Sequence, residues 1–145
     1  MIYLISFAII ILFVLNYFRD KRISNPEKIR KELGLGSHQP LIGIVAVIRR
    51  WKGHNYFIDA VPLILEKFPD ARFAIIGSGP GYEIIRSRVQ SQGLQKAIFV
   101  LGHREDIPEI MAALDIHCVA SFGLEGTAQV IPQAFAMKTP VVSTH

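Results

Sequence analysis

Cysteine is nearly absent from this 145-residue sequence: the only one, Cys118, lies in an apolar run and has no partner for an internal disulfide. The five histidines include no pair at the spacing of zinc ligands, so we predict no metal site. No serine, histidine and acidic residue occur together in the context of a nucleophile elbow. These absences argue against a disulfide framework, a zinc enzyme and a serine hydrolase, and the lone thiol is typical of a reducing cytosol.

Charge is scarce as well, at 19% of residues, and residues 1–18 carry none. As a helix with about 1.5 Å rise per residue, that segment would span roughly 27 Å, close to the hydrocarbon thickness of a bilayer. Basic residues are dense between positions 19 and 31, whereas none precedes the segment. The positive-inside bias therefore predicts a transmembrane anchor over 1–18, with the body of the protein at the cytoplasmic face of the membrane.

Two other interpretations of residues 1–18 stay open. A cleaved signal peptide fits less well, because Tyr17, Phe18 and Arg19 follow the apolar run where small residues would form a cleavage site. The second alternative is that the segment is an internal apolar element of a longer protein.

The net charge of +4 is modest, and its one dense cluster of basic residues, at 19–31, suits anionic lipid better than nucleic acid. We expect membrane lipid contact there and no nucleic-acid partner.

From residue 41 onward, short apolar runs alternate with amphipathic segments, which is typical of a doubly wound α/β fold with a Rossmann-like parallel sheet. A basic linker at 19–40 precedes this domain, which we expect to be incomplete because no helix follows the last run. One apolar stripe, predicted to lie in the core, comprises Phe57, Ile58, Val61, Ile64, Leu65 and Phe68. The predicted strands are 41–47, 72–76, 98–101, 116–119 and 141–143, and the predicted helices are 26–33, 54–67, 82–92, 108–114 and 127–137.

Ligands of open α/β sheets bind beyond the carboxyl ends of the strands, so the loops there hold the candidate residues. The first loop offers Arg49 and Lys52, with Gly53 opening the next helix. Cations beside a helix N-terminus form a natural diphosphate site. The alternative for this loop is a solvated basic turn.

The second loop contains Gly77 and Gly79, which let the backbone approach a ligand closely. As a dinucleotide fingerprint it fails, because Tyr82 stands where the third glycine is required and no acidic residue follows about 20 positions on. A nicotinamide-dependent dehydrogenase is therefore disfavoured. A tight strand-to-helix turn explains the glycines at least as well.

The fourth loop offers Glu125, followed by Gly126 and Thr127 at the start of a predicted helix, where free backbone N–H groups can bind phosphate oxygens. If that helix extends from 126, Gln133 lies two turns on and can share a face with Glu125. The alternative is that Glu125 is only a favourable charge near a helix N-terminus.

Four motifs in order resemble the C-terminal domain of GT-B-fold retaining glycosyltransferases, the "glycosyl transferases group 1" or family 4 set, over about residues 25 to 145. Residues 49–53 are similar to the family's Arg and Lys-Gly element, 77–80 to its Gly-x-Gly-Pro turn and 101–106 to its Leu-Gly-x-x-x-Asp loop. Residues 121–133, with Pro140 and Val141 beyond, are similar to its Glu-x7-Glu signature and the strand after it.

The resemblance implies that Arg49 and Lys52 hold the diphosphate of a UDP- or GDP-linked sugar donor, helped by the backbone at Gly126 and Thr127, while Glu125 contacts the sugar or β-phosphate. It implies that Gly102 and His103 border the base and that position 133 reaches the ribose. Gln133 departs from the family's second glutamate and loses a charge-assisted bond, which lowers donor affinity or changes the donor preference.

The implied activity is retaining glycosyl transfer to a glycan or lipid-linked acceptor in cell-envelope polysaccharide synthesis, with no cofactor beyond the donor substrate. The resemblance also implies an N-terminal acceptor-binding domain, which residues 1–24 are too few to form. We therefore expect a missing domain or partner subunit. We also expect this chain alone to have no transferase activity or very weak activity. The alternative is a membrane-anchored, non-catalytic module that binds a nucleotide-sugar or a protein.

Overall fold

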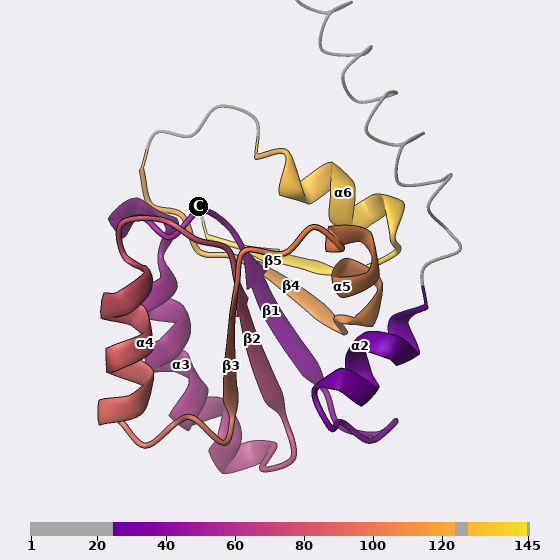
Figure 1. The fold of residues 1–145 in the computed structure, drawn as a ribbon, viewed down its shortest axis with the longest axis horizontal. Coiled ribbons are helices and arrows are strands. Elements are labelled where there is room, and N and C mark those ends of the chain that lie inside the picture. Colours follow the sequence, from indigo (N-terminus) through magenta and orange to yellow (C-terminus); the bar gives the residue numbers. More distant parts are fainter. Residues whose placement is uncertain (1–24, 124–127, 145) are drawn as a thin grey trace, which may run out of the picture.

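The computed structural model describes residues 25–123 and 128–144, which form one parallel sheet with helices on both faces (Figure 1). The helices are α2 (Pro26–Glu32), α3 (His54–Lys67), α4 (Tyr82–Ser91), α5 (Ile107–Ala113) and α6 (Val130–Ala136), with a short 3-10 turn, η1, at Arg50–Lys52. The strands are β1 (Leu41–Val45), β2 (Arg72–Ile76), β3 (Ile98–Gly102), β4 (Ile116–Val119) and β5 (Val141–Ser143). The predicted α/β doubly wound sheet is confirmed.

The strand order is β3-β2-β1-β4-β5, and every neighbouring pair is parallel. The chain builds outward from β1 to β3 and then returns to place β4 on the other side of β1. The order therefore reverses between β1 and β4. In open α/β sheets, the crevice at such a switch point, beyond the carboxyl ends of the strands, is where ligands bind.

Two apolar clusters hold the layers together, one on each face of the sheet. Helices α3 and α4 cover one face and α2, α5 and α6 cover the other (Figure 1). Phe73 and Ile75 of β2 point into the first cluster, whereas Ala74 and Ile76 point into the second. This alternation follows the two-residue period of a strand, and burial on both faces explains why the strands are continuous apolar runs.

Three sequence predictions need correction. β1 ends at Val45 rather than at residue 47, because the chain turns at once and the Arg49 N–H donates to the Val47 carbonyl. Phe68, predicted to be in the core, is 59% exposed; it lies next to Pro69, which disfavours helical geometry in the preceding residue, and its φ is −130°.

The third correction concerns α6, which begins at Val130 rather than at residue 127. Pro132 has no N–H and its ring clashes with the carbonyl four residues earlier, so it is best tolerated in the first turn of a helix, although α3 contains Pro62 in its interior. A helix that began at residue 127 would hold Pro132 in its interior. In a helix that begins at Val130, Pro132 is the third residue and lies in the first turn.

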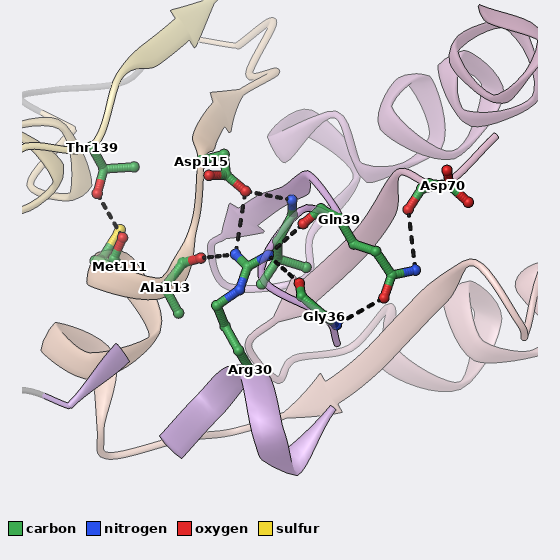
Figure 2. Close-up of polar contacts among 9 residues, drawn as sticks. Arg30, Gly36, Gln39, Asp70, Met111, Ala113, Asp115 and Thr139 are labelled. Atoms are coloured by element: carbon green, nitrogen blue, oxygen red, sulfur yellow. Dashed lines mark hydrogen bonds and ion pairs between the residues drawn. The ribbon is translucent and has the colours of Figure 1, made fainter. Parts of the chain in front are cut away.

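A buried arginine joins α2 to the amino-terminal edge of the sheet (Figure 2). The Arg30 side chain donates to the carbonyls of Ala113, Gly36 and Gln39 and pairs with Asp115 at 3.3 Å. Asp115 in turn accepts from the Leu41 N–H at 2.7 Å. The result is that α2, the loop before β1 and the turn before β4 are tied to one guanidinium.

Within 25–123 and 128–144, no helix has both the length and the apolar character needed to span a bilayer. The predicted anchor at 1–18 and residues 19–24 of the predicted lipid-contact segment at 19–31 lie outside the described residues.

Candidate functional site

A cavity of about 360 Å³ opens at the switch point between β1 and β4. Its walls come from the end of β1 and the residues beyond it, from the end of β4 and its loop, and from the start of α6. We call it the switch-point cavity, and the residues lining it are 44–47, Trp51, Lys52, 118–121 and 128–130. It lies where the topology predicts a ligand site.

Lys52, which the sequence predicts to be a donor-site cation, lines this cavity. Gly53 holds it there: its φ of 76° is left-handed, and a side chain at this position would overlap the carbonyl oxygen of Ala120. The first loop and the loop after β4 are thus in direct backbone contact, strengthened by the Phe122 N–H that donates to the Trp51 carbonyl at 2.9 Å. Gly53 therefore shapes the cavity without lining it.

Arg49 lies elsewhere. Its guanidinium stacks on the Trp51 ring at 5.2 Å, and the residue lines a separate cavity of about 230 Å³. We call this the arginine cavity; it is bounded by Ile48, Arg49, Arg50, His54, Asn55, Gly81, Ile84 and Ile85. The structure therefore places the two predicted phosphate-binding cations, Arg49 and Lys52, in the walls of different cavities.

The backbone of the second loop requires glycine at positions 77 and 79. Both have positive φ, 138° at Gly77 and 146° at Gly79, and a side chain at either would press against backbone carbonyls of Ala46 or Ile48. The loop is also bonded to the β1 exit, because the Ile48 N–H donates to the Ser78 carbonyl at 2.8 Å. The close backbone approach predicted for a ligand is thus made to the neighbouring chain segment, although Gly77 also lines a cavity.

That third cavity, about 320 Å³, lies beside the first and shares Val45, Ala46, Val47 and Val130 with it. We call it the glycine-loop cavity, because Gly77 and Ser78 line it together with His103 and Arg104. Gly102, just before His103, has a φ of 67° and accepts a hydrogen bond from the Gly77 N–H at 2.8 Å. The predicted neighbours of the base, Gly102 and His103, are thus brought to the second loop.

Arg104 is not a free cation in this cavity. It donates to both carboxylate oxygens of Asp106, at 2.8 and 2.7 Å, and to both of Glu32 on α2, at 2.6 and 3.0 Å. These hydrogen bonds lower the pKa of both carboxyl groups and raise the pKa of Arg104 further. The two carboxylates more than neutralise the guanidinium, so among the described residues that line this cavity Arg104 is not available to bind a phosphate.

Gln133 lies on α6, half-buried, one turn after Val130 of the cavity wall, and it lines neither the switch-point nor the glycine-loop cavity. Glu125, Gly126 and Thr127 lie outside the described residues, and their predicted roles stay predictions. The chain on either side of them reaches the site, since Gly123 packs against Trp51 and Ala128 lines the switch-point cavity.

Sequence reasoning missed His117 in β4, which is fully buried between β1 and the α5–α6 layer. Its Nε2 accepts the Val45 N–H at 3.3 Å, where β1 and β4 have stopped pairing through their backbones. Burial lowers its pKa to about 4, so the ring is neutral and able to accept. A histidine within an apolar strand at the switch point was the available signal.

Comparison with known proteins adds an independent finding. The model of the family "Glycosyl transferases group 1" matches residues 39–145. The lipopolysaccharide core biosynthesis mannosyltransferase LpsB of Rhizobium meliloti is 29% identical over 139 residues, which cover 90% of this chain and 39% of LpsB.

Solved structures of other proteins share the fold. HepE of Anabaena, crystallised in complex with UDP-glucose, has a TM-score of 0.71 at 28% identity and is matched over 81% of this chain and 33% of its own. The C-terminal domain of a glycosyl transferase group 1 family protein (LpcC) from Francisella tularensis has a TM-score of 0.64 at 27% identity, over 82% of this chain and 64% of that domain. The chain spans between 25% and 39% of the length of the curated relatives it matches.

Proposed function

The chain belongs to the glycosyl transferases group 1 family, and from that membership we propose that its switch-point cavity binds the diphosphate and sugar of a nucleotide-diphosphosugar donor. The observation that carries the proposal is the position of Lys52, a half-buried cation in the wall of a cavity at the β1/β4 switch point. HepE, a relative of the same fold, was crystallised with UDP-glucose.

The nucleoside would occupy the adjoining glycine-loop cavity. Its lining is mostly apolar, with His103 at the rim, and its one arginine is neutralised by Asp106 and Glu32. A flat, uncharged base suits such a lining, whereas the charged diphosphate suits the end that Lys52 lines. The two adjoining cavities thus match the two chemical halves of a nucleotide-sugar, with UDP and GDP donors both open.

For retaining transfer, the bond from the anomeric carbon to the donor phosphate breaks and its electron pair goes to the leaving diphosphate. Lys52 would stabilise that developing charge, which is electrostatic work by a preorganised group. Arg49 is proposed to add to the positive field from its place on the Trp51 ring, and Glu125, with the backbone at Gly126 and Thr127, to contact the sugar and phosphates. Gln133 is proposed to bond a ribose hydroxyl as a neutral partner.

The acceptor is proposed to be a glycan or a lipid-linked glycan of the cell envelope, reached at the cytoplasmic face of the membrane. We further propose that these 145 residues bind donor without transferring sugar efficiently on their own, because the acceptor side of the cleft would come from an N-terminal domain or subunit. Gln133, in place of the family's glutamate, also favours a second candidate: a membrane-anchored module that binds nucleotide-sugar without catalysis.

Calorimetric titration of the full chain in detergent, with UDP, GDP and UDP-glucose, tests the donor site. Lys52→Ala is expected to weaken binding by about tenfold or more, as for loss of a charge-assisted bond. Lys96→Ala is the matched control, because Lys96 is exposed, lies at the amino-terminal end of the edge strand β3 and lines neither cavity. Saturable binding that needs Lys52 supports the proposal; equal affinities in the two variants, or no binding by folded protein, contradict it.

Transfer assays then separate the two candidates. Release of UDP from UDP-glucose together with glycosylation of a lipid-linked acceptor, in the presence of a supplied acceptor domain, supports the enzyme. Donor binding without any transfer under those conditions supports the non-catalytic module.

A further inference from the structure

The arginine cavity and the switch-point cavity share no lining residue, although Arg49 of the first stacks on Trp51 of the second. Arg49 and Arg50 are both exposed and line it, and neither pairs with a carboxylate within the part of the chain that the structure describes. None of its lining residues is acidic. The cavity is thus positively charged, and the proposed donor, which draws only on the field of Arg49, does not account for Arg50 or His54.

His54 is the second and independent observation. It lines the cavity and is only 2% exposed, yet neither ring nitrogen has a hydrogen-bond partner among the described residues. A buried polar group without a partner destabilises a fold, so such groups are rare unless a ligand or water satisfies them. Burial and the neighbouring Lys52 lower the pKa of His54 to about 4. Its neutral ring therefore offers one N–H donor at neutral pH.

The backbone also makes the arginine cavity favourable for an anion. His54 and Asn55 open α3, of 14 residues, and Gly81 immediately precedes α4, of 10 residues, so the amino-terminal ends of two helices meet at one cavity. Helix amino-terminal ends carry a partial positive charge and unpaired N–H groups that favour anions. At α4 the Gly81 and Tyr82 N–H groups already donate to the carbonyls of Ile48 and Gly79, so this end contributes mainly its partial charge. The Asn55 side-chain oxygen accepts from Arg88 at 2.6 Å, which leaves its amide nitrogen as the group able to donate.

We propose that the arginine cavity is a second anion site, which binds a phosphate group separately from the nucleotide-sugar donor. Its volume, about 230 Å³, is below the roughly 300 Å³ at which pockets for whole small molecules begin. It therefore suits a phosphate or phosphomonoester rather than a complete nucleotide. The proposal stands on residues that the donor site does not use as lining, so it survives if the donor assignment fails.

The test is a titration of the ¹⁵N-labelled full chain, in a phosphate-free detergent, with inorganic phosphate in the absence and presence of saturating UDP. Phosphate is expected to shift the amide signals of Asn55, Gly81 and Ile84 saturably, with an affinity that UDP changes less than about twofold. Competition between phosphate and UDP would overturn the proposal, because the ion would then be reporting the donor site. No saturation at about 10 mM phosphate would also overturn it.

Variants locate the site. Arg50→Gln is expected to weaken phosphate binding by about tenfold or more, whereas the control Arg86→Gln removes the same charge from an exposed position on α4 and is expected to leave it unchanged. Equal effects would mean that net charge alone matters, and would refute a built site. His54→Leu is expected to raise the melting temperature without phosphate and to reduce the stabilisation that phosphate gives; a purely structural histidine would leave the second quantity unaltered.

Glycerol 3-phosphate distinguishes the source of the ligand. Binding at least about tenfold tighter than inorganic phosphate, and lost in Arg50→Gln, identifies a phosphomonoester such as a lipid headgroup. Equal affinity, with the same dependence on Arg50, identifies a site for the phosphate group alone. Either result supports the anion site, and insensitivity of both ligands to Arg50→Gln contradicts it.

Discussion

Gly53→Ala should destabilise the fold and disturb the proposed donor site, and the loss in the free energy of unfolding can be separated into two parts. The residue has a φ of 76°, and an alanine side chain there would overlap the carbonyl oxygen of Ala120. The left-handed backbone costs about 1–2 kcal/mol for a residue with a side chain, and forced overlap in a packed region adds about 1–3 kcal/mol. The expected loss in the free energy of unfolding is therefore about 2–5 kcal/mol.

Gly34→Ala is the matched control. Gly34 has nearly the same φ, 66°, but no atom lies within 4 Å of the side chain it would gain. Its cost should be the backbone part alone, about 1–2 kcal/mol. Urea denaturation of the two variants gives the steric part as the difference. Equal losses would refute the close contact between the first loop and the loop after β4, and with it the explanation of how Lys52 is held beside the cavity.

Two further predictions concern buried polar groups. His54 and His117 have pKa values lowered to about 4 from 6.5, so the unfolded chain binds up to two more protons than the folded one between those values. The contribution of the two histidines to the stability should be constant above about pH 7 and fall as the pH drops from 6.5 towards 4, by up to about 2.7 kcal/mol per pH unit. A flat profile over that acidic range, in urea denaturation at stepped pH, would contradict the buried neutral rings. Arg30→Leu should lower the free energy of unfolding by about 3–5 kcal/mol, because it leaves three carbonyls and Asp115 without their partner. Asp115→Asn, which keeps an acceptor for the Leu41 N–H, should lower it by about 1 kcal/mol. Similar thermal denaturation midpoints for the two variants would show that the guanidinium does not tie the segments together.

The regular part of the fold follows from local pattern. The observed strands at 72–76, 116–119 and 141–143 coincide with the predicted ones, because a strand buried on both faces is a short continuous apolar run. The family membership also followed from the order of the loop motifs. The errors at Phe68 and at the start of α6 came from extending a helical pattern across the influence of a nearby proline.

Tertiary relations could not be predicted from one sequence. Nothing local distinguishes Arg30, whose side chain is buried against Ala113 and Asp115 more than 80 residues away, from the exposed lysines of α2. Likewise, the contacts of Gly77 depend on where the β1 exit passes, not on the glycine motif. The separation of Arg49 from Lys52 depends on the turn that follows β1 and on the stacking of Arg49 on Trp51.

The central claim is that a nucleotide-sugar lies across the switch-point and glycine-loop cavities, with its base beside His103 and its diphosphate beside Lys52. Cross-linking of the full chain with a UDP-glucose analogue that carries a photoreactive azide on the uracil ring, followed by peptide mapping, tests it most directly. We expect labelling within residues 76–78 or 103–107, protection by UDP, and strongly reduced labelling in Lys52→Ala but not in Lys96→Ala. Labelling elsewhere, or labelling at these residues that neither UDP nor the loss of Lys52 reduces, would contradict the claim.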